Sequence, residues 1–221
     1  MKPWLAVDTA TETASIAVAD EAVLAERTWR GQRNHTVLLA QAVAHLLAGC
    51  GVAVKDLGGI AVAIGPGSYT GLRVGLSLAK GVALAAGLPV VGVPTLHAVA
   101  AALSPPAAAR SLELHAVLRA GRDRYAVATY PPAPEDWPDA HAAEALTLAE
   151  ILTSRAPPAW IAGELTPDDA DRLLAAGFHV PPVAARVRRA AYLVDLGRAL
   201  TPTVPEDLAG LTPAYLGRGP L

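Results

Sequence analysis

The chain has 221 residues with 18 basic and 20 acidic side chains, and its formal net charge of −2 gives no global attraction to nucleic acid or to a membrane surface. Cys50 is the only cysteine, which excludes an internal disulfide and a thiolate metal cluster and favours a cytoplasmic location. No stretch approaches the roughly 20 apolar residues of a membrane helix. The apolar run before Asp8 is too short for a signal-peptide core, so we expect no membrane association.

The first hundred residues alternate short apolar runs with helical patterns. Apolar runs bounded by turn residues predict strands over 4–7, 15–19, 22–27, 59–64 and 89–93. Cap residues, terminal glycines and periodic apolar positions predict helices over 34–49, 70–86 and 95–103. This order predicts a mixed sheet with packed helices, forming an amino-terminal α/β lobe over 1–103.

The second half repeats this plan in a weaker form. Residues 104–110 contain a proline pair and are interpreted as a linker. The chain beyond it, 111–221, is predicted to form a smaller α/β lobe with an irregular, proline-punctuated tail. Its strands are expected over 112–118, 125–130 and 159–162, and its helices over 147–154, 167–176 and 184–200.

A glycine-rich loop joins the fourth predicted strand to the helix over 70–86. Glycines permit close backbone approach, and the start of a helix attracts anions, so the loop is a candidate phosphate site. Its spacing matches neither the dinucleotide fingerprint nor a P-loop, and it lacks the usual lysine. Asp8 and Thr9, after the first strand, lie where open α/β sheets bind ligands, although a capping role for Asp8 is equally consistent. The candidate anion-site residues are Asp8, Thr9, Gly65, Gly67, Ser68, Thr70 and Arg73.

Small residues recur every fourth position in two of the predicted helices. Such a ladder lets another element approach the helix backbone closely. It indicates either docking of each helix on its own sheet or contact with a second chain. The candidate interface residues are Ala40, Ala44 and Ala48 in the helix over 34–49, and Gly71, Gly75, Ala79 and Ala83 in the helix over 70–86.

The remaining polar residues form no recognisable catalytic group. None of the six histidines occurs in an H-x-x-x-H or H-E-x-x-H pattern, so a zinc hydrolase site is unsupported. A small basic cluster at Arg186, Arg188 and Arg189 is interpreted as a solvated face, or as an RNA-facing patch within a larger complex. We therefore predict neither catalytic residues nor a metal site.

Three stretches resemble the TsaB (YeaZ) family. They are VDTATETASIAVA at 7–19, the NHT around His35, and above all GPGSYTGLRVGLSLAKG at 65–81, followed by LPVVGVPT at 88–95. The resemblance covers nearly all of the first half and is thinner from 105 to 180. It implies the two-lobed α/β fold of actin, Hsp70 and sugar kinases.

The resemblance also implies a function. TsaB proteins are non-catalytic paralogues of TsaD, and with TsaD and the ATPase TsaE they support threonylcarbamoyl transfer to adenosine 37 of tRNA. The implied partners are TsaD and TsaE, a second copy when the chain is alone, and tRNA through the complex. No cofactor is expected on the isolated chain, and ATP with Mg²⁺ would belong at the complex interface. The rival hypotheses are an autonomous ATP-dependent enzyme and, with less support, a metallopeptidase-like protein.

Overall fold

A computed structural model describes residues 1–31, 35–131, 137, 142–200 and 204–216. The chain divides into two units. Unit 1 comprises Met1–Thr95 and Arg189–Pro213, and unit 2 comprises Leu96–Arg188 and Ala214–Leu221. Residue 34, the first of the helix predicted over 34–49, and the end of the predicted tail, 217–221, lie outside the described residues.

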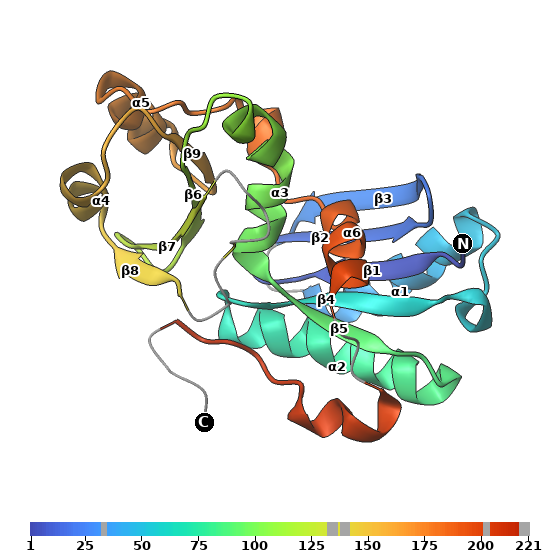
Figure 1. The fold of residues 1–221 in the computed structure, drawn as a ribbon. Coiled ribbons are helices and arrows are strands. Elements are labelled where there is room, and N and C mark those ends of the chain that lie inside the picture. Colours follow the sequence, from blue (N-terminus) through green and yellow to red (C-terminus); the bar gives the residue numbers. More distant parts are fainter. Residues whose placement is uncertain (32–34, 132–136, 138–141, 201–203, 217–221) are drawn as a thin grey trace. The chain divides into compact units, whose positions relative to one another are not determined.

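Unit 1 is built on a five-stranded mixed sheet in the order β3-β2-β1-β4-β5 (Figure 1). The strands β1 and β2 pair antiparallel, as do β2 and β3, whereas β4 is parallel to β1 and β5 is parallel to β4. The strands are β1 (Trp4–Asp8), β2 (Thr13–Ala19), β3 (Val23–Arg30), β4 (Gly59–Gly65) and β5 (Val90–Pro94). All five were predicted to within a few residues.

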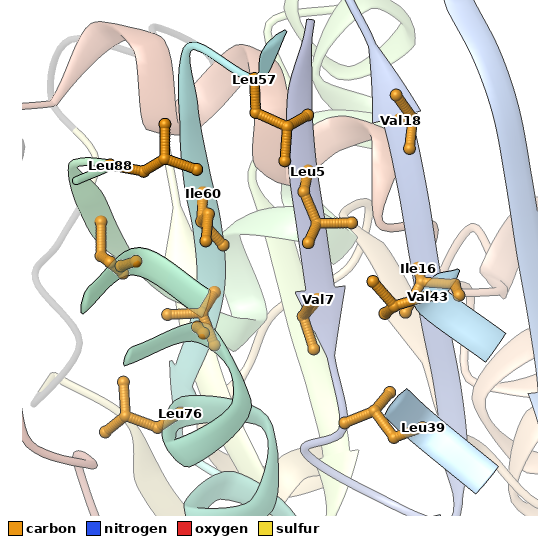
Figure 2. Packing of buried hydrophobic residues seen from close by; sticks show 14 of the residues in the cluster. Leu5, Val7, Ile16, Val18, Leu39, Val43, Leu57, Ile60, Leu76 and Leu88 are labelled. Carbon is orange, nitrogen blue, oxygen red and sulfur yellow. The ribbon is translucent and has the colours of Figure 1, made fainter. Parts of the chain in front are cut away.

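The two faces of this sheet carry side chains of different size. Leu5 and Val7 alternate with Ala6, and the same large-small-large pattern recurs in β2 and β4. The larger side chains form one core with helices α1 (His35–Gly49) and α2 (Tyr69–Ala86), and Figure 2 shows them converging between the sheet and these helices. Both helices lie close to their predicted positions. They therefore form one layer over the sheet, with their other sides turned away from it.

The opposite face of the sheet holds α6 (Ala191–Ala199). The alanines on this face leave room for close approach: a Cβ added at Gly197 would lie 3.0 Å from the Cβ of Ala61. Short 3-10 segments at η1 (Val54–Asp56) and η4 (Pro205–Gly210) contact α2, and Leu208 of η4 joins the core. Unit 1 is thus completed by a segment from the far end of the chain.

Unit 2 has a four-stranded sheet in the order β8-β7-β6-β9. One core joins it to α3, and a second core joins its other face to α4 and α5. The strands are β6 (Leu114–Arg119), β7 (Tyr125–Tyr130), β8 (Glu144–Leu146) and β9 (Trp160–Gly163); the helices are α3 (Thr95–Ala108), α4 (Leu148–Ser154) and α5 (Pro167–Ala175). The strand β8 was not predicted, because three residues are too few to show a pattern.

The division into units differs from the predicted lobes, 1–103 and 111–221, in three ways. Residues 96–103, which were predicted in the first lobe, belong to unit 2. Residues 104–108 are not a linker: α3 continues through Pro105, because Ala100, Leu103 and Ala107 form one buried stripe against the unit 2 sheet. The segment 189–213 belongs to unit 1 rather than to the second lobe.

The single helix predicted over 184–200 is also wrong. A 3-10 segment, η3 (Val183–Arg186), is separated from α6 by residues that are held by other groups. Arg188 is 2% exposed and forms an ion pair with Glu164 inside unit 2. Arg189 pairs with Glu26 in unit 1, where the Ala190 N–H also donates to Ser15 Oγ at 3.0 Å. Arg188 is therefore not part of a solvated face, whereas Arg189 is exposed and pairs with Glu26 at the surface.

Candidate functional site

The predicted anion-site residues come together where β1 and β4 end. The Ser68 N–H donates to the Ala10 carbonyl at 2.6 Å, and the Thr9 hydroxyl donates to the Gly71 carbonyl at 2.7 Å. The turn after β1 therefore packs directly on the loop and the first turns of α2. Sequence reasoning placed these residues together correctly, at the carboxyl ends of parallel strands.

The polar groups of this loop are largely used within the chain. Asp8 is fully buried, and its Oδ1 accepts from the Ala10 N–H at 2.9 Å, which is the capping role considered from the sequence. The Gly65 N–H donates to Thr95 Oγ1 at 3.0 Å, and Ser68 caps α2 by accepting from the Gly71 N–H. N–H groups that are already donated cannot hold a phosphate in this conformation. These residues do not fit a phosphate cradle.

Arg73 and Thr70, the other predicted members of the anion site, are exposed on α2. The Arg73 guanidinium lies over the ring of Tyr69, 4.0 Å from its centroid. This cation–π contact accounts for the position of the side chain on the outside of the helix. Arg73 therefore does not take the place of the missing phosphate lysine.

The small residues of α2 serve the core of unit 1, which corrects their assignment to a partner interface. A Cβ at Gly71 would lie 2.1 Å from the Thr9 carbonyl oxygen, and a Cβ at Gly75 would lie 2.3 Å from Thr9 Oγ1. Ala79 and Ala83 have no exposed surface. The close approach that the ladder permits is the approach of α2 to its own unit, and the buried Gly75, Ala79 and Ala83 are not available to a second chain.

The small residues of α1 have the opposite orientation: Ala40, Ala44 and Ala48 are exposed. On α2, the exposed residues include a second series at the same spacing, which sequence reasoning missed. We call the combined surface the outer helix face; it comprises Ala40, Gln41, Ala44, His45 and Ala48 of α1 with Arg73, Ser77, Gly81, Leu84 and Ala85 of α2.

The outer helix face has two unusual properties for an exposed surface. In the part of the chain that the structure describes, no Cβ contact requires Gly81, although a glycine within a helix costs about 0.5–1 kcal/mol relative to alanine. The 15 residues of α1 contain no Asp, Glu, Lys or Arg, and the 18 residues of α2 contain only Arg73 and Lys80, in a chain that is 17% charged. Exposed helix faces normally carry charges, whereas the centres of protein interfaces are depleted of them.

A shallow hollow of about 460 Å³ lies beside this face, where η1 meets the end of α2. It is lined by Val54, Lys55, Val82, Ala85 and Ala86. Leu84, which is 63% exposed, adds further apolar surface at this end of α2. The apolar character of the outer helix face therefore continues to its rim.

The described residues also bear on metal binding and on membrane insertion. Within those ranges, no three His, Cys, Asp or Glu side chains are grouped so that they could hold a metal ion. In the same part of the chain, no helix has the length and hydropathy needed to cross a bilayer.

Unit 2 contains a buried histidine with a strongly lowered pKa. His115 is 1% exposed, its Nδ1 lies 3.0 Å from Thr129 Oγ1, and its Nε2 has no hydrogen-bond partner among the described residues. Burial, aided by the charge of Arg155, lowers the pKa of His115 from 6.5 to about 4. The imidazole is therefore neutral at physiological pH.

This histidine makes the stability of unit 2 depend on pH. Between pH 6.5 and 4 the unfolded chain binds a proton that the folded chain does not, so the free energy of unfolding falls as the pH is lowered through this window, by about 3 kcal/mol in total. His115→Leu should flatten this dependence in urea denaturation at pH 7, 6 and 5. Replacing the exposed His45 with Ala should leave it unchanged. An equally steep profile for His115→Leu would contradict the assignment.

The architecture is that of a two-lobed α/β protein of the actin, Hsp70 and sugar-kinase type, which confirms the predicted fold class. Two solved structures both have a TM-score of 0.74. One is "YeaZ from Pseudomonas aeruginosa", and the other is described as a protein "with similarity to peptidase YEAZ from Pseudomonas aeruginosa". They share 24% and 22% sequence identity, and the similarity covers 98% of this chain and 100% of theirs.

The family model described as "TsaD: tRNA N6-adenosine threonylcarbamoyltransferase" matches residues 23–210, and the chain belongs to this family. Among curated relatives, the TsaB protein of Escherichia coli is 38% identical over 96 residues and that of Bacillus subtilis is 43% identical over 98. These matches cover 43% and 44% of this chain, and 42% and 43% of the relatives. The chain thus matches less than half the length of each relative. The resemblance to TsaB and YeaZ read from the glycine-loop region is confirmed.

Proposed function

We propose that this chain is a non-catalytic, activating subunit in the synthesis of N6-threonylcarbamoyladenosine at position 37 of tRNA. It pairs with a TsaD chain through the outer helix face, with TsaE as a further partner, and it meets tRNA in the cytoplasm as part of that complex. The named TsaB relatives support the pathway. The observation that carries the proposal is the exposed, nearly uncharged layer formed by α1 and α2.

The accessory role is supported by the state of the glycine loop. Asp8 and the N–H groups of Gly65 and Ser68 are all occupied within the chain. They offer a nucleotide neither a free carboxylate nor a backbone cradle. Any ATP and Mg²⁺ bound by the complex would then be held mainly by partner residues.

Ala44→Arg tests the interface. The side chain lies at the middle of the outer helix face and is exposed, so the variant should fold normally. An arginine buried there without a partner should weaken binding of the TsaD chain from the same genome more than ~30-fold. Mass-resolved chromatography and biolayer interferometry would measure this, with Ala44→Ser as the matched control. Unchanged binding by Ala44→Arg would refute the interface.

An autonomous ATP-dependent enzyme is the second candidate, and one observation favours it. The Asp8 carboxylate lies at the end of β1 beside the start of α2, where α/β proteins often bind phosphate groups. Calorimetry with Mg-ATP on the isolated chain separates the two functions. Tight binding with turnover, both lost in Asp8→Asn, would support the enzyme and contradict the accessory role.

A further inference from the structure

The strand β3 forms one edge of the unit 1 sheet (Figure 1). It pairs with β2 on one side, and in the described part of the chain no strand pairs with its other side. Its eight residues include neither proline nor lysine, which commonly protect an open edge. Arg27, Thr28 and Arg30 are exposed. This edge therefore presents a row of backbone groups to which a further strand can be added.

The hydrogen-bond pattern shows which backbone groups of β3 point away from β2. The Gly31 N–H donates to the Glu12 carbonyl at 3.0 Å, directly beyond the last pair of the β2–β3 ladder. Because the bonds to one neighbour alternate along an antiparallel strand, the backbone groups of Glu26, Thr28 and Arg30 point to the open side. The register shift in this ladder lies near the start of β3, so the alternation is regular from residue 25 onward.

The side chains of β3 are self-complementary in one antiparallel register. A two-fold axis beside Thr28 would set Thr28 against its own copy and Glu26 against Arg30 of the other copy. The same register sets Arg27 against Trp29. Opposite charges and a cation–π contact are favourable cross-strand pairs. An axis beside Glu26 or Arg27 would instead place two like charges directly opposite each other, which disfavours those registers.

The charged side chains of this row already have partners within the chain, and these partners do not oppose the pairing. Arg30 forms an ion pair with Glu12, and Glu26 forms one with Arg189. Each pair is neutral, so bringing Arg30 of one copy beside Glu26 of the other joins two neutral pairs into a network without net charge. The pair between Arg30 and Glu12 is largely exposed, so its rearrangement costs little.

We propose that β3 is a pairing site for a second copy of this chain, in the antiparallel register centred on Thr28. The two unit 1 sheets then form one continuous sheet, in which the outward backbone groups of Glu26, Thr28 and Arg30 are paired across the axis. The outer helix face contains no residue of β3. The inference therefore goes beyond the function proposed above and does not depend on it.

Charges at residue 28 test the register, because a residue on the axis meets its own copy. Thr28→Lys and Thr28→Glu should each weaken self-association of the full chain about 10-fold, and an equimolar mixture should restore it, since lysine then faces glutamate. Sedimentation equilibrium would measure this, and circular dichroism with thermal melting would show that both variants fold. Both lose the same hydrogen bond, 2.9 Å between Thr28 Oγ1 and Ser15 Oγ, so each variant controls for the other.

Several results would overturn the inference. They are a wild-type chain that stays monomeric at ~1 mM, a dimer that neither Thr28 variant weakens, and a mixture that does not recover. Ala44→Arg should leave self-association unchanged; if it abolishes self-association and the Thr28 variants do not, the second copy occupies the outer helix face instead. The proposed function fails separately, because its interface is refuted by unchanged binding of the TsaD chain to Ala44→Arg, whatever the Thr28 variants show.

Discussion

Gly71→Ala is expected to destabilise unit 1 by about 3 kcal/mol, because the new Cβ would lie 2.1 Å from the carbonyl oxygen of Thr9. The obstacle is backbone rather than the end of a flexible side chain, so either the turn after β1 or the whole of α2 must shift. A shift would also strain the hydrogen bond from the Thr9 hydroxyl to the Gly71 carbonyl. Urea denaturation followed by circular dichroism would measure the loss.

Gly81→Ala is the matched control in the same helix. No atom of the described residues lies within 4 Å of its added Cβ, so helix propensity alone should stabilise the protein by about 0.5–1 kcal/mol. The opposite signs separate a glycine needed for packing from one exposed on the outer helix face. If both variants were neutral, the close contact between α2 and Thr9 would be wrong. Bulky residues at Gly75 or Ala79 would likewise destabilise the fold of unit 1. They would therefore not test the binding of a partner chain.

Glu164→Ala should cost unit 2 up to about 3–5 kcal/mol, because it removes one member of the ion pair with the buried Arg188. The guanidinium has lost its hydration on burial, so loss of the Glu164 carboxylate is not offset by water. Thermal and urea unfolding would detect the change. Replacing both residues with apolar side chains, Glu164→Leu with Arg188→Met, should recover much of the loss.

The matched control is the ion pair between Arg30 and Glu12, whose side chains are 79% and 75% exposed. Water already screens this pair, so Glu12→Ala should leave the unfolding midpoint unchanged within error. Equal losses of stability in Glu12→Ala and Glu164→Ala would contradict this prediction. They would show that the burial of Arg188 does not determine how much its ion pair with Glu164 stabilises unit 2.

The amino-terminal elements could be predicted because each is specified locally. The Leu-Ala-Val and Ile-Ala-Val runs indicate strands that are buried on both faces, and Gly87 ends α2 in the left-handed conformation expected of a carboxyl-terminal cap. The meeting of Asp8 and the glycine loop also followed from the sequence, because parallel strands end at the same edge of a sheet.

The orientation of the small-residue ladders could not be predicted in this way. A four-residue repeat shows that Gly71, Gly75 and Ala79 share a face, but the partner of that face depends on Thr9, which is 62 positions from Gly71 in the sequence. The same repeat in α1 faces outward. The break before α6 was missed for a related reason, because Arg189 and Ala190 are held by Glu26 and Ser15 from the opposite end of the chain.

The discontinuity of unit 1 has a consequence for biosynthesis. Residues 1–95 leave the ribosome first, but the alanine-lined face of their sheet stays open to water until α6 has been translated, and Leu208 of η4 joins the core on the other face later still. Most of unit 2 is synthesised in between, as one continuous stretch, so we expect the later-made unit to reach its native core before the earlier-made one. A nascent chain stalled near residue 188 should therefore hold an incomplete sheet that depends on chaperones, and release of the last thirty or so residues should complete it.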